Sequence, residues 1–137
     1  MDQLLDKRTQ WRDKDDSVRT IGSVDILIVA PYNAQVDALS AAIGDRARIG
    51  TVDKFQGQEA PIVIYSTASS SAEDAPRGME FLYESNRLNV ATRRSMCMTI
   101  MVAAPKLFEP ACRTPRQMQL ANTFCRYAEL AAAIDFV

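Results

Sequence analysis

Short apolar runs alternate along this chain with segments whose apolar residues recur at helical spacing, and this alternation constrains the fold most. Residues 24–30 form a nearly continuous apolar run, which is typical of a strand covered on both faces. Pro31 ends the run, and apolar residues then recur at helical spacing until Gly44. Strands joined by helical crossovers form a parallel sheet. The sequence therefore predicts an α/β fold, a three-layer α/β/α sandwich with a mainly parallel sheet.

The same alternation continues toward the carboxyl terminus. Further strands are predicted over residues 48–52, 61–67 and 98–103. A helix is predicted over residues 84–94, and the serine- and acid-rich residues 68–77 are predicted to form a surface loop.

A long closing helix is predicted to begin at Thr114 and Pro115. A hydroxyl side chain followed by proline is a common helix start, because the hydroxyl caps a free N–H group and proline fits the first turn. Helical spacing predicts one buried face for this helix, made of Met118, Ala121, Cys125, Ala128 and Ala132.

The chain has 137 residues, enough for one main domain with its own core. Residues 1–20 are polar and carry charges of both signs, so they are predicted to form an arm or linker, with a short helix followed by a hairpin or a loose arm. Trp11 is expected to pack back on the main domain, which is predicted to span residues 21–137.

The composition excludes several classes of function. The chain contains no histidine, and its three cysteines form no close pair, so zinc sites, disulfide frameworks and histidine-based catalysis are not supported. No apolar run is long enough to cross a bilayer and the polar start is not a signal peptide, so no membrane association and a cytoplasmic location are expected. A net charge of −1 argues against a protein that coats nucleic acid through bulk charge.

Nucleotide-binding loops are also absent from the sequence. None of the five glycines is followed by lysine, so no phosphate loop of the Gly-x-x-x-x-Gly-Lys-Ser/Thr type is present. The dinucleotide-binding pattern Gly-x-Gly-x-x-Gly is missing as well. The chain is therefore not expected to hold ATP by itself.

Polar side chains follow the predicted strands instead. Tyr32 and Gln35 come after the first strand, and Thr51 and Asp53 follow the second, where a ring, an amide or a hydroxyl could contact a sugar or phosphate. Glu59 could accept a hydrogen bond from a ribose hydroxyl. The alternative for residues 56–59 is a tight turn between two strands that binds nothing.

Arg94 lies near the end of a predicted helix. One reading is a cation that stabilises the carboxyl end of the helix, worth roughly 0.3 to 1 kcal/mol. The other is an arginine finger, whose charge stabilises phosphoryl transfer on a nucleotide held by another domain.

Three segments resemble motifs IV, V and VI of superfamily 1 helicases, in the usual order. They are Val-Ala-Pro-Tyr-Asn-Ala-Gln at 29–35, Gly-Thr-Val-Asp-Lys-Phe-Gln-Gly-Gln-Glu at 50–59 and Arg-Leu-Asn-Val-Ala-Thr-Arg-Arg at 87–94. The nearest group is the 5′-to-3′ branch (superfamily 1B) of the nonsense-decay and Dna-two-type helicases. Residues 71–83 and 108–118 are similar to a bacterial subgroup that is often fused to a RecB-like nuclease.

The resemblance implies the second RecA-like domain of a helicase motor, a P-loop NTPase fold without the P-loop. ATP and Mg²⁺ would be held mainly by a first domain that carries the phosphate loop, and this chain alone would hold neither stably and would be inactive. Arg94 would be the catalytic arginine finger. The residues implied for the nucleotide are Gln56, Gly57, Glu59 and Arg94, and those for single-stranded DNA or RNA are Pro31, Tyr32, Gln35, Thr51 and Asp53.

The implied partners are a single strand, the upstream RecA-like domain and a fused RecB-like nuclease. Self-association is expected through the face that the upstream domain would cover. Arg93, Ser95 and Met96 depart from the family's pattern, in which a small hydroxyl residue, an alanine and a second arginine are usual. One hypothesis is that Arg93 replaces part of the lost charge. The alternative function is a free-standing nucleic-acid or protein interaction module with a helicase-derived fold and no ATPase activity.

Overall fold

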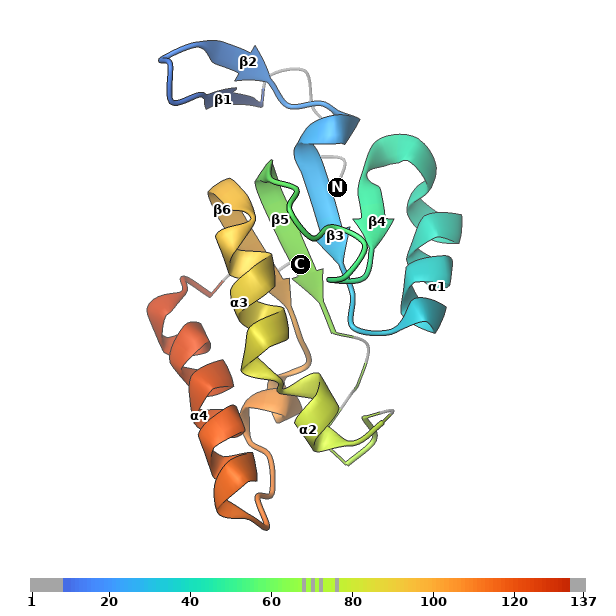
Figure 1. The fold of residues 1–137 in the computed structure, drawn as a ribbon, viewed down its shortest axis with the longest axis vertical. Helices are drawn as coiled ribbons and strands as arrows, with labels where there is room; N and C mark the ends of the chain where they lie inside the picture. The colour runs from blue at the N-terminus through green and yellow to red at the C-terminus, as the bar shows by residue number, and fades with distance from the viewer. Residues whose placement is uncertain (1–8, 68, 70, 72, 76, 134–137) are drawn as a thin grey trace. The chain divides into compact units, whose positions relative to one another are not determined.

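The computed structural model describes residues 9–133 except residues 68, 70, 72 and 76 (Figure 1). The chain divides into two compact units. The first consists of Met1–Ser66 and Val90–Val102, and the second of Thr67–Asn89 and Ala103–Val137. The predicted boundary at residue 20 stays a prediction.

A four-stranded parallel sheet forms the centre of the first unit. Its strands, in spatial order, are β4 (Arg48–Gly50), β3 (Ile26–Val29), β5 (Ala60–Ser66) and β6 (Ser95–Val102). The parallel sheet and its flanking helices confirm the predicted α/β, RecA-like fold (Figure 1). All four residues of β3 are buried, as expected for a strand covered on both faces.

The first predicted strand begins two residues later than expected. Residues Ser23–Asp25 form a 3₁₀ helix, because the Asp25 carboxylate accepts the Gly22 N–H at 2.8 Å and closes a turn. Val24 is consequently 67% exposed rather than part of the core.

Helix α1 (Asn33–Ile43) packs on this sheet and ends as predicted. Gly44 follows it with φ +65°, a conformation that glycine adopts without steric cost. Val36, Leu39 and Ile43 pack against a buried cluster that includes residues of β3, β4 and β5. These three side chains are partly buried, so each contributes less than the roughly 1.5 to 3 kcal/mol of a fully buried one.

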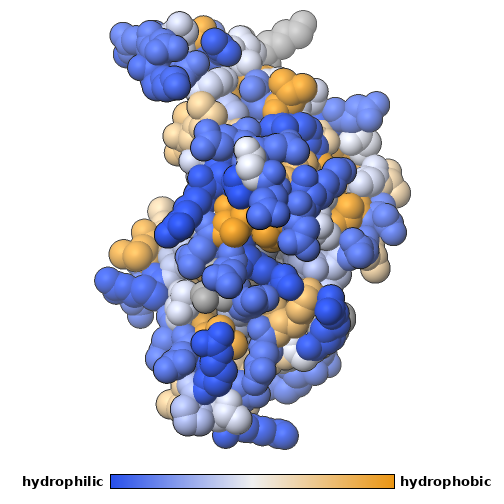
Figure 2. Space-filling model, in the orientation of Figure 1, coloured by the Kyte–Doolittle hydropathy of each residue, from blue (hydrophilic) through white to orange (hydrophobic). Residues whose placement is uncertain are grey.

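The polar arm contains a hairpin, as predicted. β1 (Gln10–Arg12) pairs antiparallel with β2 (Val18–Thr20), and Trp11 packs against the same buried cluster as α1. Figure 2 shows hydrophilic residues over almost all of this hairpin. The short helix predicted before it falls on residues outside those described.

The second unit is built from short helices around aromatic side chains. It contains α2 (Met79–Leu82), the start of α3 (Ser85–Arg93), a 3₁₀ helix at Pro105–Phe108 and α4 (Pro115–Leu130). The Thr114 hydroxyl accepts the Gln117 N–H at 3.1 Å, which confirms the predicted helix start. Among the described residues, no helix combines the length and the hydrophobicity needed to cross a bilayer.

The predicted buried face of α4 is correct at Ala121 and otherwise wrong. The buried residues are Leu120, Ala121 and Phe124, whereas Met118 is 56% exposed. Of the other predicted residues, Cys125 is half-buried, Ala128 is exposed, and Ala132 lies beyond the end of the helix. Phe124 determines this orientation, because its ring packs against Tyr83 at 4.8 Å and Phe108 at 5.0 Å between centroids, and large rings bury more area than alanine or cysteine.

Candidate functional site

Residues 51–59 connect two strands that run in the same direction, and they do so through turns rather than a helix. β4 ends at Gly50 and β5 begins at Ala60, and both are parallel to β3, which lies between them. All strands of this sheet begin at one end, the amino end, and finish at the other, the carboxyl end. The connection must therefore cross the sheet from end to end, with Thr51 at the carboxyl end and Glu59 at the amino end.

Two consecutive turns shape this crossing segment. The Gln56 N–H donates to the Asp53 carbonyl at 3.3 Å, and the Gln58 N–H donates to the Phe55 carbonyl at 3.0 Å. Gly57 is the third residue of the second turn and has φ +82°, a conformation that favours glycine at this position. Phe55 anchors the segment in the core with 4% of its surface exposed, as its residue type predicts.

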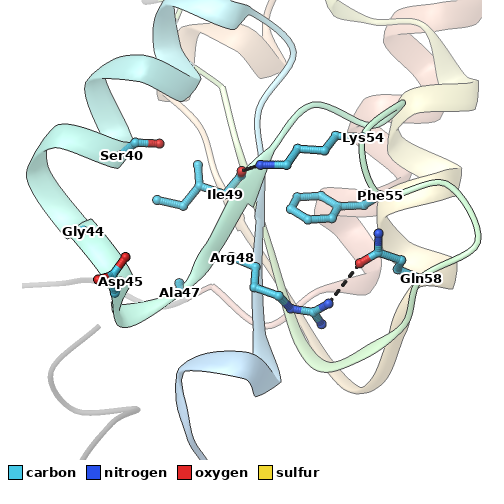
Figure 3. Close-up of a pocket in the computed structure, with 9 residues that line it drawn as sticks. All are labelled: Ser40, Gly44, Asp45, Ala47, Arg48, Ile49, Lys54, Phe55 and Gln58. Carbon is cyan, nitrogen blue, oxygen red and sulfur yellow. Dashed lines mark hydrogen bonds between the residues drawn. The ribbon is translucent and has the colours of Figure 1, made fainter.

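Lys54 fixes the start of the crossing segment to the sheet. Its ammonium donates to the carbonyl of Ile49 at 2.8 Å (Figure 3). β4 is the last strand on its side of the sheet, and the carbonyl of the next residue, Gly50, accepts a hydrogen bond from Ala30 of the β3 side. Since alternate carbonyls of a strand point in opposite directions, Lys54 satisfies one that faces away from β3.

The predicted nucleic-acid residues gather at the carboxyl end. Val29 pairs with Gly50 on one side and with Tyr65 on the other, so Ala30, Thr51 and Ser66 lie level with one another. Pro31 is buried just beyond Ala30, and Tyr32 is the residue that precedes α1. Asp53 is exposed two residues after Thr51. Four of the five predicted residues therefore follow β3 or β4 directly.

Gln35, the fifth, lies on the first turn of α1 and binds a residue that the sequence reasoning missed. Its amide nitrogen donates to the carbonyl of Ser66 at 3.1 Å and to the Ser66 hydroxyl at 3.0 Å. Among the described residues, its amide oxygen is buried without a partner. Ser66 is a polar residue at the end of β5. A polar residue at a strand end is the pattern by which Thr51 was predicted, so the same pattern could have identified Ser66.

The predicted nucleotide residues lie toward the amino end. Glu59 is exposed immediately before β5, and Arg94 is half-buried immediately before β6. The Ala60 N–H donates to the Arg94 carbonyl at 3.0 Å, which joins the two strand starts. Gln56 and Gly57 are exposed in the turn that leads to Glu59. No hydrogen bond or ion pair to another described residue occupies the Arg94 guanidinium.

The residues that depart from the helicase pattern lie around Arg94. The Ser95 hydroxyl donates to the Thr92 carbonyl at 3.0 Å and lies 2.6 Å from the Thr99 hydroxyl. The first contact connects the end of α3 to β6, and the second lies within β6. Arg93 is exposed, and Met96 is 46% exposed.

Two further observations concern other ligands. Among the described residues, no group of three or more cysteine or acidic side chains is arranged to hold a metal ion. Burial raises the pKa of the Cys125 thiol, with further contributions from Glu129 and Cys112, so this thiol stays protonated at neutral pH. The polar groups that the predicted site residues bring to the two ends of the sheet are hydroxyl, amide, carboxylate and guanidinium groups.

Comparison with known proteins identifies the family. A family profile described as an AAA domain matches residues 3–106. A putative helicase, mov-10-B.1 of Danio rerio, is 32% identical over 122 residues, which cover 77% of this chain and 12% of that protein. The probable RNA helicase armi of Drosophila melanogaster is 42% identical over 88 residues, covering 58% of this chain and 7% of the relative.

A third relative is the DNA replication ATP-dependent helicase/nuclease JHS1 of Arabidopsis thaliana, which is 31% identical over 103 residues. The match covers 74% of this chain and 8% of the relative, so the chain spans about a tenth of the length of these proteins. The chain belongs to the AAA-domain family that its profile match identifies, and it is a superfamily 1 helicase-like domain.

Proposed function

We propose that this chain is the second RecA-like domain of an ATP-dependent helicase, with nucleotide at the amino end of the sheet and a single strand at the carboxyl end. The observation that carries the proposal is the crossing segment, residues 51–59. It begins with Thr51 at the carboxyl end of the sheet and ends with Glu59 at the amino end. One stretch of backbone therefore connects the proposed nucleic-acid surface to the proposed nucleotide surface.

The amino end supplies one wall of the nucleotide site. Glu59 contacts the sugar of the nucleotide, with Gln56 and Gly57 beside it, and Arg94 acts as the arginine finger. The hydrogen bond from the Ala60 N–H to the Arg94 carbonyl supports this assignment, since it joins the starts of β5 and β6 and so keeps Glu59 and Arg94 close together. A cation with no protein counter-ion among the described residues is available for phosphate charge. ATP and Mg²⁺ are held mainly by an upstream RecA-like domain that carries the phosphate loop.

The carboxyl end supplies the contacts to single-stranded nucleic acid. Pro31, Tyr32, Thr51 and Asp53 line it, and Gln35 acts through Ser66. Because the Ser66 hydroxyl accepts from the Gln35 amide, its own proton is free to be donated to a phosphate oxygen. Contacts of this kind go to phosphate and sugar, which suits a strand that is moved regardless of sequence.

Cycles of ATP binding, hydrolysis to ADP and phosphate, and product release move the strand. Nucleotide affinity that differs between open and closed arrangements of two RecA-like domains shifts the population between them. The crossing segment carries this shift from Glu59 to Thr51, because Phe55 and Lys54 hold it firmly on the sheet.

The names of the relatives support further parts of the proposal. They include a probable RNA helicase and a DNA replication ATP-dependent helicase/nuclease. A single strand of nucleic acid is therefore the proposed substrate. A fused RecB-like nuclease, as in the bacterial subgroup, is a proposed partner. We also propose a cytoplasmic location, and self-association of the isolated chain through the surface that the upstream domain covers.

The test joins this chain to a RecA-like domain that carries a phosphate loop and measures ATP hydrolysis with and without single strands. We expect hydrolysis that single strands stimulate and that Arg94→Ala abolishes. The isolated chain is expected to hydrolyse no ATP, and hydrolysis by it that survives repurification and disappears in Arg94→Ala would overturn the proposal. Strand binding without any hydrolysis in the joined protein would support the interaction module instead.

A further inference from the structure

We propose that Arg48 is a positioning residue that holds the nucleotide-facing end of the crossing segment in place. Nothing in the helicase resemblance assigns this residue, and the inference rests on the proposed role of Glu59. Arg48 begins β4 and is half-buried, whereas the residues that it contacts, Gln58 and Glu59, come just before β5.

The guanidinium of Arg48 makes two hydrogen bonds to consecutive residues. One terminal nitrogen donates to the side-chain oxygen of Gln58 at 3.0 Å (Figure 3). The other donates to the backbone carbonyl of Glu59 at 3.4 Å. Among the described residues, its Nε is buried without a partner. Both terminal nitrogens therefore bind the end of the crossing segment.

The register of the sheet explains why a long side chain is needed at this position. Arg48 lies level with Leu27, while Ile62 lies level with Ile26, so Glu59 is several residues nearer the amino end than Arg48. The side chain must reach past the start of its own strand to contact the turn. A shorter donor at position 48 would not reach it.

The peptide group between Glu59 and Ala60 is held from both sides. Its carbonyl accepts from Arg48 and its N–H donates to the carbonyl of Arg94. Because the C=O and N–H of a trans peptide point in opposite directions, Arg48 and Arg94 bind opposite sides of one rigid plane. Arg48 thus sets the backbone that carries the Glu59 side chain and that contacts the proposed arginine finger.

Few other contacts can substitute for these bonds. Arg48 and Gln58 both line an open pocket of about 470 Å³ between α1, β4 and the crossing segment, so solvent reaches their surroundings. Glu59 itself is exposed. A lysine at position 48 would keep the charge but could not place two donors in the fixed fork of a guanidinium.

The first measurement is backbone amide exchange in this chain. Arg48→Ala is expected to speed exchange at Ala60 about tenfold, as loss of hydrogen bonds at a partly exposed site implies, and Arg48→Lys is expected to speed it less. Arg46→Ala is the matched control. It also removes one positive charge, but the Arg46 side chain donates to the carbonyls of Ile43 and Ala42 at the end of α1. Unchanged exchange at Ala60 in Arg48→Ala, or an equal change in Arg46→Ala, overturns the proposal.

The second measurement uses the chain joined to a RecA-like domain with a phosphate loop. Arg48→Ala is expected to raise KM for ATP about tenfold with kcat changed less than about twofold, Arg48→Lys to recover part of the loss, and Arg46→Ala to change neither. An unchanged KM in Arg48→Ala beside a raised KM in Glu59→Gln overturns the positioning role alone. An unchanged KM in Glu59→Gln overturns the proposed nucleotide role of Glu59, and the inference with it.

Discussion

The side chain of Lys54 crosses directly over the backbone of Gly50. A Cβ atom at Gly50 would lie 2.4 Å from Lys54 Cδ and 3.0 Å from Phe55 Cε2. The crossing brings the Lys54 ammonium to the Ile49 carbonyl at 2.8 Å on the outer strand of the sheet. Glycine is therefore favoured at this position of the motif V segment by the space that Lys54 needs above the strand, since the φ of Gly50 is not positive.

This relationship predicts the effect of Gly50→Ala. We expect a loss of roughly 1 to 3 kcal/mol of unfolding free energy, because the new methyl group displaces Lys54 and presses on Phe55. Chemical denaturation measures it. The double variant Gly50→Ala with Lys54→Ala should recover part of the loss, since the nearest clashing atoms are gone. A double variant as unstable as the sum of the two single variants would contradict the explanation.

The proposed arginine finger gives a second prediction. In the joined protein, Arg94→Ala should lower kcat for ATP hydrolysis about 10³-fold or more, because the charge acts on the transition state. The unfolding midpoint of the isolated chain should change little, as no described partner of the guanidinium is lost. Arg93→Ala is the control, since Arg93 is exposed and adjacent. A larger loss of kcat in Arg93→Ala than in Arg94→Ala would assign the finger to Arg93.

Ser66 and Gln35 give a third prediction. Ser66→Ala should weaken binding of single strands by this chain about fivefold, the effect of one hydrogen bond to a phosphate, with little change in stability. Gln35→Ala should weaken binding in the same direction and also lower stability, because it removes the bonds between α1 and β5. Fluorescence anisotropy of a labelled single strand at two salt concentrations measures the binding of both variants, and chemical denaturation measures their stability.

The control for this pair is Ser40→Ala, which removes an exposed hydroxyl elsewhere on α1. Equal binding by the Ser66→Ala and Ser40→Ala variants would remove Ser66 from the nucleic-acid surface. An affinity that does not fall with added salt would argue against phosphate contacts altogether.

Features decided by local backbone chemistry were predictable from the sequence. Gly44 ends α1 because it can adopt a positive φ, and Thr114 starts α4 because its hydroxyl caps a free N–H. The buried run of β3 was equally clear, since a strand covered on both faces needs uninterrupted apolar residues. These signals lie within a few residues of the structure that they determine.

Features decided by distant partners were not predictable in the same way. Thr51 and Glu59 belong to one motif in the sequence, but they lie at opposite ends of the sheet, because β4 and β5 run parallel on either side of β3. The buried face of α4 was predicted correctly only at Ala121, because Phe124 packs on Tyr83 and Phe108, which lie outside the helix. The bond between Gln35 and Ser66 joins residues 31 positions apart, so no local pattern indicated it.

Tyr83 gives the last prediction, which concerns stability and its dependence on pH. Its hydroxyl donates to the buried carbonyl of Leu107, and its ring packs on Phe124. Tyr83→Phe keeps the ring and removes the donor, so we expect a loss of roughly 1 to 3 kcal/mol from the unsatisfied carbonyl. Burial, followed by Cys125, Glu73 and Cys112, raises the pKa of Tyr83 above its usual value of 10.0.

The sign of the pH effect follows from this raised pKa. Below pH 10 both states keep the phenol protonated, so Tyr83 adds no pH dependence there. Above pH 10 the unfolded state releases the proton first, so unfolding free energy should fall as pH rises. Burial raises the pKa of Tyr127 as well, so Tyr83→Phe should reduce the alkaline slope without abolishing it. Denaturation curves on either side of pH 10 measure the slope, and an identical slope in Tyr83→Phe would show that Tyr83 ionises equally in both states.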